Sequence, residues 1–586
     1  MCCSRRVQIP LPDIDFARIR PSGQPASRSS GFEELASILI EQDVVEWPDG
    51  VRFDRFGNPD GGREGRGVLP NGDVWAWQAK YLFEFDSSAT AQVTKSVRRV
   101  LDRELSLKRY FVALPVDLPA GDTDVPERMS AQTRWTNKVS EWEKLARDKG
   151  LDVEFVFVGA HQLLTALTEP QHAGRARYWF GTDVLTPEWQ DNRLDEIIAK
   201  VGRRYSPRLH IKVDAIRALD AAGRTEAYVQ RWQRVLAELR EARRWPWRAP
   251  AEVTNADSQA LPRCAIALDK VDAALELMIA AMRSLESMPA VESALAAATK
   301  AARHLNDLLH ERSLTTDKYF VDDAGSLYSE VRHALEALRR GDELARSAVS
   351  QAAASKFLLL TGRAGVGKTH LMCDVARRRV ADGRPTILLL GQDFDSRSFL
   401  PQIGELSQLG GSLDDMLAVL DAASEAAGRV GLFMIDALNE SERPDRWRDD
   451  IQALTTAASR FPHVALVLSC RTEFVDAVVG DQMLPSGEHA GFAEATDVAI
   501  QRFTREYGLE PPTFPVLNPE FSNPLYLKLT CEALTTLGVA RFPFGAAGLL
   551  AVCRAFLEAV NKRISEAGRC DYDERNNLVD RAIRPG

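Results

Sequence analysis

The feature that most constrains the fold is a glycine-rich loop between an apolar strand and a helix. The stretch LLLTGRAGVGKTHLMCDVA matches the Walker A pattern, from Gly362 through Gly365 and Gly367 to Lys368 and Thr369. The glycines let backbone N–H groups turn toward phosphate oxygens, Lys368 reaches the β- and γ-phosphates, and the Thr369 hydroxyl binds Mg²⁺. The sequence therefore predicts ATP and Mg²⁺ as ligands of this segment.

Four short apolar runs place that loop in a sheet. They read SKFLLLTG, RPTILLLG, VGLFMIDAL and HVALVLSCR, and helical stretches separate them. Strands that alternate with helices form a parallel sheet with helices on both faces. We expect a doubly wound parallel sheet in which the strand that ends at Asp436 lies beside the strand of the glycine-rich loop.

Polar residues follow two of these strands. Asp436, at the tip of its strand, can hold the water shell of Mg²⁺. Glu440 is placed to polarise an attacking water, with Asn439 beside it, and a solvated loop acid is the alternative. Arg471 ends the next strand and can sense the γ-phosphate, with a plain surface arginine as the competing interpretation.

These segments resemble one class of nucleotide-binding proteins. IDALNE is similar to the DGLDE form of the NACHT and related STAND NTPases, LSCR resembles their sensor strand, and FSNPLYLKL resembles the GxP-type motif of their helical domain. The resemblance implies that Pro524 lies near the adenine, although Asn523 stands where small residues are common. It also implies a switch that holds nucleotide, oligomerises on sensing a partner and activates an effector. A generic AAA+ motor is the rival, and the absence of an obvious second-region arginine finger favours the STAND class.

A second constraining stretch lies near the N-terminus. DGGREGRGVLPNGDVWAWQAKYLFEF, residues 60–85, places acids in a glycine-rich turn ahead of a strand that ends at Lys80. One interpretation is a hairpin with a solvated edge, and the other is a metal site for cutting phosphodiester bonds. Carboxylates can hold Mg²⁺, which polarises the phosphate, while a lysine positions or activates the attacking water.

This stretch resembles the Mrr-like branch of the PD-(D/E)xK nucleases. The resemblance implies that Glu64 is the metal acid, Gln78 a neutral oxygen ligand of the metal, and Lys80 the catalytic lysine. Glu34, in the helix GFEELASILI, matches an acid of that branch and would complete the site, with a solvated helix position as the equal alternative. Asp60 is expected to shape the turn. The chain departs from the pattern in having Glu64 where Asp is commoner.

The helix that follows this strand is basic on one side. Lys95, Arg98, Arg99 and Arg103 fall within one broad arc and could hold DNA phosphates without sequence preference. Asp102 lies in the same arc, and such a mixture of charges usually marks an ordinary solvated face.

The order of segments resembles the antiviral STAND (Avs) family with an N-terminal Mrr-like nuclease. KRYFVALPVDLP, VEFVFVGAHQLLTAL and VGRRYSPRLHI look like that family's segments. The resemblance implies sensing of a phage structural protein of the terminase or portal class, assembly into a homo-oligomer, typically a tetramer, and cleavage of double-stranded DNA. The chain ends where the helical or winged-helix part should continue. We therefore expect an apolar stripe there, with Leu549, Val552, Phe556 and Val560, to lack cover. The expected chain is either a truncated reading frame or a product whose sensor lies on another chain.

The expected domain organisation is a multidomain α/β chain. The parts are a disordered leader (1–30), a restriction-endonuclease-like α/β nuclease domain (31–185), a helical linker (186–325), a P-loop STAND core (326–490), and a partial helical or winged-helix tail (491–586).

Bulk composition excludes several classes of protein. The net charge of −9 argues against a protein coated in nucleic acid, and no apolar run is long enough to span a bilayer. The eight cysteines have no metal-type spacing, which suits a reducing cytoplasm. The sequence thus favours a cytoplasmic, ATP-controlled DNA endonuclease. The alternative is a regulatory STAND ATPase whose N-terminal domain binds DNA or protein without cutting.

Overall fold

The computed structural model describes most of the 586-residue chain. It covers residues 12–23, 25–56, 61–119, 130–181, 185–243, 259–315, 323–409, 411–513, 518–536 and 540–542, with single residues 516, 538 and 557. The side chains of residues 312–315 and 323–326 are not part of this description. Asp60 and the expected apolar stripe of Leu549, Val552, Phe556 and Val560 lie outside the described residues. The chain forms two compact units, residues 1–186 with 409–426, and residues 187–408 with 427–586.

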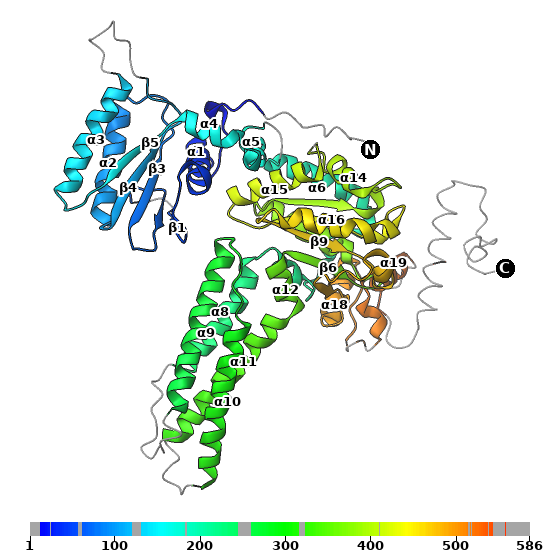
Figure 1. Cartoon of the computed structure of the whole chain (residues 1–586). Helices are drawn as coiled ribbons and strands as arrows, with labels where there is room; N and C mark the ends of the chain where they lie inside the picture. The colour runs from blue at the N-terminus through cyan, green and yellow to red at the C-terminus, as the bar shows by residue number, and fades with distance from the viewer. Residues whose placement is uncertain are drawn as a thin grey trace, which may run out of the picture. The chain divides into compact units, whose positions relative to one another are not determined.

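The first unit is built on a five-stranded sheet in the order β1-β2-β3-β4-β5 (Figure 1). The strands β1, β2 and β3 are antiparallel, and β3, β4 and β5 are parallel. Their bounds are β1 Arg52–Arg55, β2 Gly65–Val68, β3 Val74–Ala79, β4 Leu107–Ala113 and β5 Glu154–Val158. The helices are α1 Arg28–Leu39, α2 Ser87–Arg103, α3 Ala131–Arg147, α4 Ala160–Thr168, α5 Ala173–Phe180 and α15 Leu413–Ala426.

Helices cover both faces of this sheet because its side chains alternate. Trp77 and Ala79 of β3 face a core built with α1 and α4, whereas Val74 and Ala76 face a core built with α2 and α3. The indole Nε1 of Trp77 donates to Ser37 Oγ on α1 at 2.9 Å, which fixes α1 on its face.

Of the leader expected at residues 1–30, residues 12–23 and 25–30 are described and pack in part on the first unit, which corrects one expectation. Phe16 and Ile19 are buried, and Phe16 packs edge-on against Phe32 and Phe180 with ring centroids 5.6 and 5.7 Å apart. The segment is rich in Pro, Ser and Arg, so its average composition does not reveal that two apolar residues are buried.

Helix α15 also belongs to the first unit, although it lies in the sequence between two strands of the second. Gly174 on α5 fits against it without a side chain, because a Cβ there would come within 2.4 Å of the Ala418 carbonyl oxygen. Arg175 pairs with Glu425 at 2.7 Å and Arg177 pairs with Asp415.

The second unit contains the parallel sheet that the sequence predicts. The four expected strands are β6 Phe357–Thr361, β7 Thr386–Leu390, β8 Gly431–Asp436 and β9 Val464–Ser469, and a short β10, Ser486–Glu488, adds a fifth. The order is β10-β6-β9-β8-β7, with every pair parallel. Strand β9 lies between β6 and β8, so the expectation that the Asp436 strand directly neighbours the loop strand is wrong.

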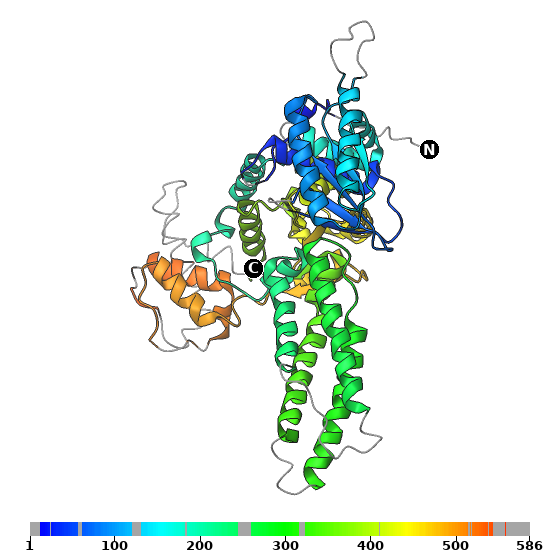
Figure 2. The ribbon, with the colours of Figure 1, turned by 90° about the vertical axis from the view of Figure 1, so that its left-hand side faces the viewer.

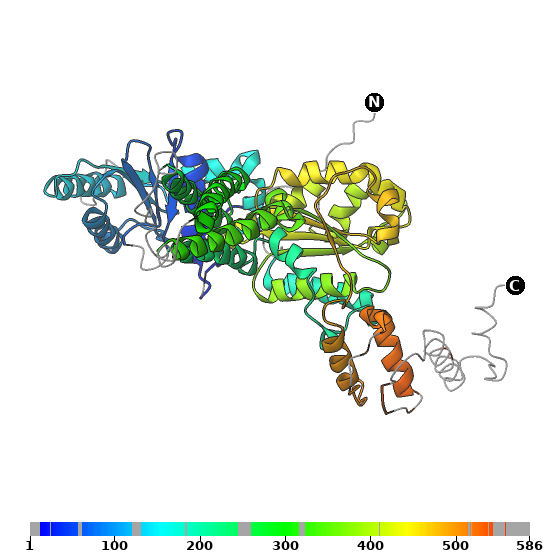
Figure 3. The same ribbon diagram turned by 90° about the horizontal axis from the view of Figure 1, so that it is seen from below.

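Helices cover both faces of the parallel sheet (Figure 3). One face packs against α6 Pro187–Val201, α7 Ile216–Ala222 and α13 Lys368–Ala381. The helices α14 Phe399–Ser407 and α16 Trp447–Ser459 pack on the other face, against β7 and β9. There the rings of Phe399 and Trp447 lie with centroids 4.5 Å apart and planes tilted by 34°. This is the layered α/β arrangement of a P-loop NTPase.

Two helical groups complete the second unit. The helices α8 Glu226–Glu241, α9 Ala260–Arg283, α10 Glu292–Thr315 and α11 Asp323–Arg346 form a bundle around a common apolar core, and α12 Ala348–Ser355 leads from it to β6 (Figure 2). The fourth bundle helix thus extends past residue 325, where the helical linker was expected to end. The helices α17 Val475–Val478, α18 Thr496–Glu506 and α19 Pro524–Thr536 follow β9, and α18 and α19 share a small core with Leu209 and Ile211.

Candidate functional site

The glycine-rich loop joins β6 to α13 and its backbone needs glycine. Gly365 and Gly367 have φ of +77° and +98°, a region that favours residues without a Cβ. A Cβ at Gly365 would also come within 3.0 Å of Leu525 Cβ, and one at Gly362 within 2.6 Å of the His489 carbonyl oxygen. The loop is therefore held by neighbours on two sides.

Lys368 is the first residue of α13 and lies almost buried under the loop. Its Nζ donates to the carbonyl oxygens of Gly362 at 2.5 Å and Arg363 at 3.1 Å. Burial lowers its pKa, while Asp436 opposes the shift. The ammonium lies where phosphate oxygens would replace the loop carbonyls as its partners.

Asp436 ends β8 and is fully buried next to the loop helix. Ser469, at the end of β9, donates to its Oδ1 at 2.6 Å, and the Thr369 hydroxyl also bonds its side chain. Burial raises the pKa of Asp436, and these two hydrogen bonds oppose the shift. Although β9 separates β8 from β6, the structure brings Asp436 and Thr369 together. An acid beside a threonine hydroxyl offers the oxygen donors that Mg²⁺ prefers, so the residues present fit that metal. Sequence reasoning missed Ser469, although it stands in the LSCR segment.

Glu440 lies between two arginines. Its Oε1 is 3.2 Å from Nη2 of Arg471, and its Oε2 is 2.8 Å from Nη1 of Arg204. The backbone N–H of Arg471 donates to Asn439 Oδ1 at 3.0 Å, which ties the segments after β8 and β9 together. Sequence reasoning missed Arg204. Its signal was the pair of arginines in VGRRYSPRLHI, but nothing in the sequence gives a partner 236 residues away.

Pro524 begins α19 and lies against the loop, 3.7 Å from the position that a Gly367 Cβ would take. The N–H of Leu525 donates to the Gly365 carbonyl at 3.1 Å, and Asn523 Nδ2 donates to the Ala364 carbonyl at 3.3 Å. Asn523, which departs from the family pattern, therefore supplies a contact of its own to the loop.

His489 follows β10 and was also missed. Its Nε2 lies 3.6 Å from the position of a Gly367 Cβ, and its Nδ1 accepts the Gly491 N–H at 3.1 Å. Burial first, and Lys368 second, lower its pKa to about 4. The imidazole is therefore neutral near pH 7 and faces the loop without adding a charge.

In the first unit, Glu64, Gln78 and Lys80 form a second cluster. Gln78 Nε2 donates to Glu64 Oε1 at 2.5 Å, and Lys80 Nζ lies 3.6 Å from the same oxygen. Gln78 is fully buried, whereas Glu64 and Lys80 are partly exposed. Since side chains alternate along β3, Gln78 and Lys80 project to the face that α2 and α3 cover.

The glycine-rich turn sets the position of Glu64. Gly61 and Gly62 have φ of +68° and +94°, and a Cβ at Gly62 would come within 2.3 Å of the Ser96 carbonyl on α2. A Cβ at Gly65 would come within 2.2 Å of the Trp77 ring. On either side of Glu64, Arg63 and Arg66 both pair with the buried Glu104, at 2.5 and 2.9 Å. The turn is therefore a packed element rather than a solvated hairpin end.

Glu34 is not brought into this cluster. It lies on α1, which packs against the opposite face of the sheet, and its partner is Arg55 at 3.6 Å. Burial raises the pKa of Glu34, and Arg55 opposes the shift. Arg55 also pairs with Glu41, so the acids of α1 and its extension hold β1 in place.

The donors at the Glu64 cluster fit one metal ion only in part. Mg²⁺ in proteins is held by one or two carboxylates together with waters and substrate phosphates, and Glu64 supplies one carboxylate. The amide nitrogen of Gln78 faces Glu64 here, so the amide has to turn over before its oxygen can join Glu64 as a ligand. Within the described ranges, no group of three or more His, Cys, Asp or Glu side chains is arranged to hold a metal.

The basic arc of α2 is exposed as expected. Among the described residues, none of Lys95, Arg98, Arg99 and Arg103 forms an ion pair, whereas Asp102 pairs with Lys149. Arg109, by contrast, pairs with Glu154 at 2.7 Å and lies over the Trp75 ring. No helix in the described part of the chain is long and apolar enough to cross a membrane.

Comparison with known proteins adds little to this geometry. No protein-family model matches the chain, and no curated protein matches it either. Among solved structures, C. elegans PCH-2 is 18% identical over 36% of this chain and 62% of the PCH-2 chain, with a TM-score of 0.19. The S. cerevisiae Hsp104-ADP complex is 13% identical over 84% of this chain and 74% of that chain, with a TM-score of 0.18. The chain thus spans under two thirds of the PCH-2 chain. The P-loop NTPase-like α/β fold of the second unit rests on its own strands and loop.

Proposed function

We propose that this chain is an ATP-controlled, Mg²⁺-dependent endonuclease for double-stranded DNA. The observation that carries the proposal is the Glu64–Gln78–Lys80 cluster at the end of β3, on the same chain as a loop that puts Lys368, Thr369 and Asp436 together. The first set suits phosphodiester hydrolysis and the second suits nucleotide binding.

In the nuclease half, Glu64 and the turned-over amide of Gln78 would hold Mg²⁺, which when bound polarises the phosphate and acidifies its water. Lys80 is held just beyond β3, because its N–H donates to the Ala113 carbonyl at 3.0 Å. From that position its ammonium can orient the attacking water or meet the charge that develops on phosphate. The exposed arc of α2 would contact the DNA backbone by charge alone.

In the nucleotide half, the loop amides and Lys368 would bind the β- and γ-phosphates, and Thr369 with Asp436 would hold Mg²⁺. Glu440 would orient the water that attacks the γ-phosphate, and Pro524 would border the adenine. Arg471 would contact the γ-phosphate, which requires it to leave Glu440. That exchange of partners gives the site a difference between its empty and ATP-bound arrangements.

The family resemblance of the sequence extends the proposal to anti-phage defence. A phage structural protein of the terminase or portal class would be the trigger, with its sensor on this or another chain. A homo-oligomer, a tetramer in the family, would be the active form.

A regulatory ATPase whose first unit binds DNA or protein without cutting it is the second candidate. The incomplete ligand set at the Glu64 cluster favours it. Among the described residues there, Glu64 alone supplies a carboxylate, and the Gln78 amide has to turn over before its oxygen can bind a metal.

One experiment separates these candidates. The full chain is incubated with ATP, Mg²⁺, a phage terminase or portal protein as the activating partner, and supercoiled plasmid. It is compared with Lys80→Ala and with a control, Lys144→Ala, which removes an exposed lysine of α3. We expect the wild type and the control to cut the plasmid, and Lys80→Ala to bind but not cut it. Equal cutting by Lys80→Ala would rule out the proposed site, and DNA binding without cutting by the wild type would favour the second candidate. Lys368→Ala should lose ATP binding and with it the control of cutting.

A further inference from the structure

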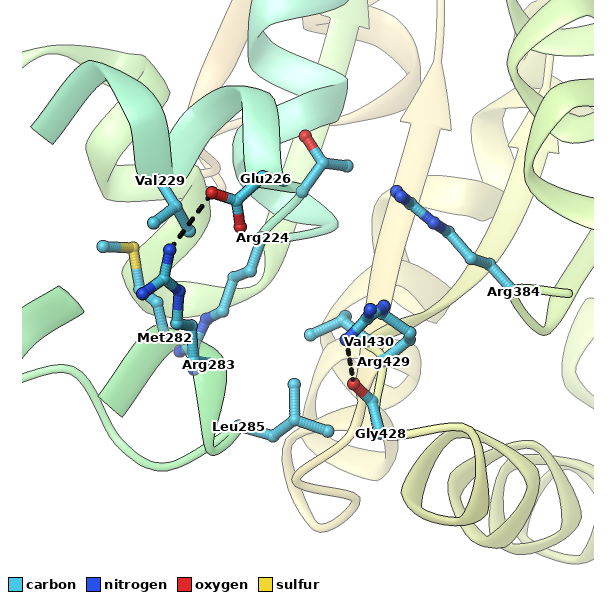
Figure 4. A pocket seen from close by; sticks show the side chains of 11 residues that line it. Arg224, Glu226, Val229, Met282, Arg283, Leu285, Arg384, Gly428, Arg429 and Val430 are labelled. Atoms are coloured by element: carbon cyan, nitrogen blue, oxygen red, sulfur yellow. Dashed lines mark hydrogen bonds and ion pairs between the residues drawn. The ribbon is translucent and has the colours of Figure 1, made fainter. Parts of the chain in front are cut away.

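A small cavity lies in the second unit, away from the nucleotide loop. It has a volume of about 70 Å³ and lies between the helical bundle and the sheet (Figure 4). The bundle side contributes the start of α8 and the end of α9. The sheet side contributes Arg384, just before β7, and residues 428–430, just before β8. These are the amino ends of parallel strands, whereas the loop that binds ATP lies at their carboxyl ends.

The lining of this cavity is strongly basic. Four arginines line it, Arg224, Arg283, Arg384 and Arg429, against one carboxylate, Glu226. Glu226 pairs with Arg283 at 3.1 Å. Arg384 has a distant partner in Asp382 at 3.9 Å, and among the described residues Arg429 donates only to the neighbouring Gly428 carbonyl, at 3.0 Å (Figure 4).

Arg224 is the most deeply buried of these four arginines, with 8% of its surface exposed. Its Nε donates to the Ala353 carbonyl at 3.2 Å and its Nη1 to the Glu286 carbonyl at 2.6 Å. Within the described part of the chain it forms no ion pair. A buried charge without a counter-ion is costly, so an anion in the cavity would relieve that cost.

A second buried arginine lies next to the residues that line the cavity. Arg379 on α13 is 5% exposed and donates to Thr386 Oγ1 at 3.0 Å and to the Val430 carbonyl at 2.5 Å. Its Nη1 is 2.8 Å from the position of a Cβ at Gly223, the residue before Arg224. It too forms no ion pair among the described residues, and burial lowers its pKa to about 9.

The cavity also lies at a helix N-terminus. Thr225 and Glu226 line it, and α8 begins at Glu226 and runs for 16 residues. The partial positive charge at the start of a helix adds to the attraction for an anion.

We propose that this cavity is a second anion site, which binds one phosphate group between the bundle and the sheet. A single water needs roughly 10–15 Å³ of such space, so the cavity holds a tetrahedral oxyanion but not a nucleotide. The bound group is either inorganic phosphate or the terminal phosphate of a larger ligand such as a DNA end. It would contact Arg384 and Arg429 from the sheet and Arg224 and Arg283 from the bundle, and thereby hold the two together.

The test uses thermal unfolding of the full chain in the Lys368→Ala background, which removes phosphate binding at the ATP loop. Millimolar inorganic phosphate is compared with chloride at equal ionic strength. We expect the Tm to rise by about 1–2 °C, as for a ligand near ten times its Kd in a unit of this size. Adding Arg384→Ala and Arg429→Ala should abolish the rise. The control pair Arg397→Ala and Arg443→Ala removes two other exposed arginines and should keep it.

Two further arms sharpen the result. Glu226→Gln removes the one carboxylate among the described lining residues and should enlarge the rise. A 5′-phosphorylated DNA oligonucleotide, compared with its 5′-hydroxyl form, tells a DNA end from free phosphate. The proposal is overturned if phosphate raises the Tm of the Arg384/Arg429 double variant as much as it raises the Tm of the parent. It is also overturned if neither phosphate nor the phosphorylated oligonucleotide raises the Tm of the parent.

Discussion

Replacing Glu440 with Gln separates two roles that this residue would combine. Its carboxylate pairs with Arg471 at 3.2 Å and with Arg204 at 2.8 Å, and in the proposed mechanism it also orients the attacking water. Gln has nearly the same size and keeps hydrogen-bonding capacity but has no charge. The substitution should therefore weaken both ion pairs without opening a cavity.

The magnitude follows from the exposure of the pairs. Arg471 is 40% exposed and Glu440 25%, so solvent screens their attraction, and such pairs are worth about 0.2–1 kcal/mol. Because Arg471 has to leave Glu440 to reach a γ-phosphate, the variant should bind ATP up to about fivefold more tightly, since about 1.4 kcal/mol corresponds to tenfold. ADP has no γ-phosphate, so its affinity should change little. Loss of the general base should lower ATP hydrolysis by about 10²–10⁴-fold.

Titration calorimetry with ATP and with ADP, together with phosphate release, measures these effects. The control is Glu442→Gln, an exposed acid two residues away that forms no ion pair among the described residues. Equal gains for ATP and ADP would show that Arg471 does not sense the γ-phosphate. Undiminished hydrolysis would remove Glu440 from the catalytic role.

Three further predictions test the structure at other points. Gly65→Ala should lower stability by about 1–3 kcal/mol in thermal or urea unfolding, because its Cβ would come within 2.2 Å of the Trp77 ring, and the loss should be smaller in a Trp77→Phe background. The pKa of His489 is lowered to about 4 from 6.5, so the unfolded chain takes up this proton first and stability should fall as pH drops from 6.5 toward 4. The contribution is at most about 3 kcal/mol, and His489→Gln should flatten this slope in urea unfolding between pH 7 and pH 5. Asp436→Asn should bind ATP without Mg²⁺ like the wild type but lose the gain in affinity that Mg²⁺ provides, as measured by calorimetry with and without the metal.

The parallel sheet could be predicted because its strands are self-evident in the sequence. Each of the four expected strands is a run of apolar residues between helical stretches, and the glycine-rich loop fixes which strand leads into a helix. The order of the strands could not be predicted from the sequence. Sequence adjacency does not say that β9 inserts between β6 and β8, because that depends on how the connecting helices pack.

The short edge strand β10 escaped prediction for a local reason. Its residues are Ser486–Glu488, with no apolar side chain to produce a pattern. They pair with β6 through backbone hydrogen bonds alone, and Gly487 fits where a Cβ would lie 3.1 Å from Ala218. Because β10 was not predicted, nothing in the sequence marked His489 as a site residue. In the structure His489 directly follows β10 and lies against the glycine-rich loop.

The grouping of Glu64, Gln78 and Lys80 was predictable, and the exclusion of Glu34 was not. Residues 78 and 80 share a face by the period of a strand, and the glycine turn returns Glu64 to the same row. Whether the preceding helix lies on that face depends on tertiary packing. Here the Trp77–Ser37 hydrogen bond holds α1 on the other face, so Glu34 meets Arg55 instead.

Both candidate sites put their charged groups where a buried strand ends. Lys80 follows β3, Asp436 ends β8 and Arg471 follows β9, at the carboxyl edge of a sheet where the backbone ladder stops and side chains can converge. Residues of this kind can be found by looking for a polar side chain directly after an apolar run. Arg204 belongs to a different kind, because it comes from a connecting segment before the bundle and meets Glu440 across 236 residues of sequence. A segment outside the sheet that pairs with the proposed catalytic acid is well placed to respond to the state of the nucleotide, since Arg204 and Arg471 share the single carboxylate of Glu440.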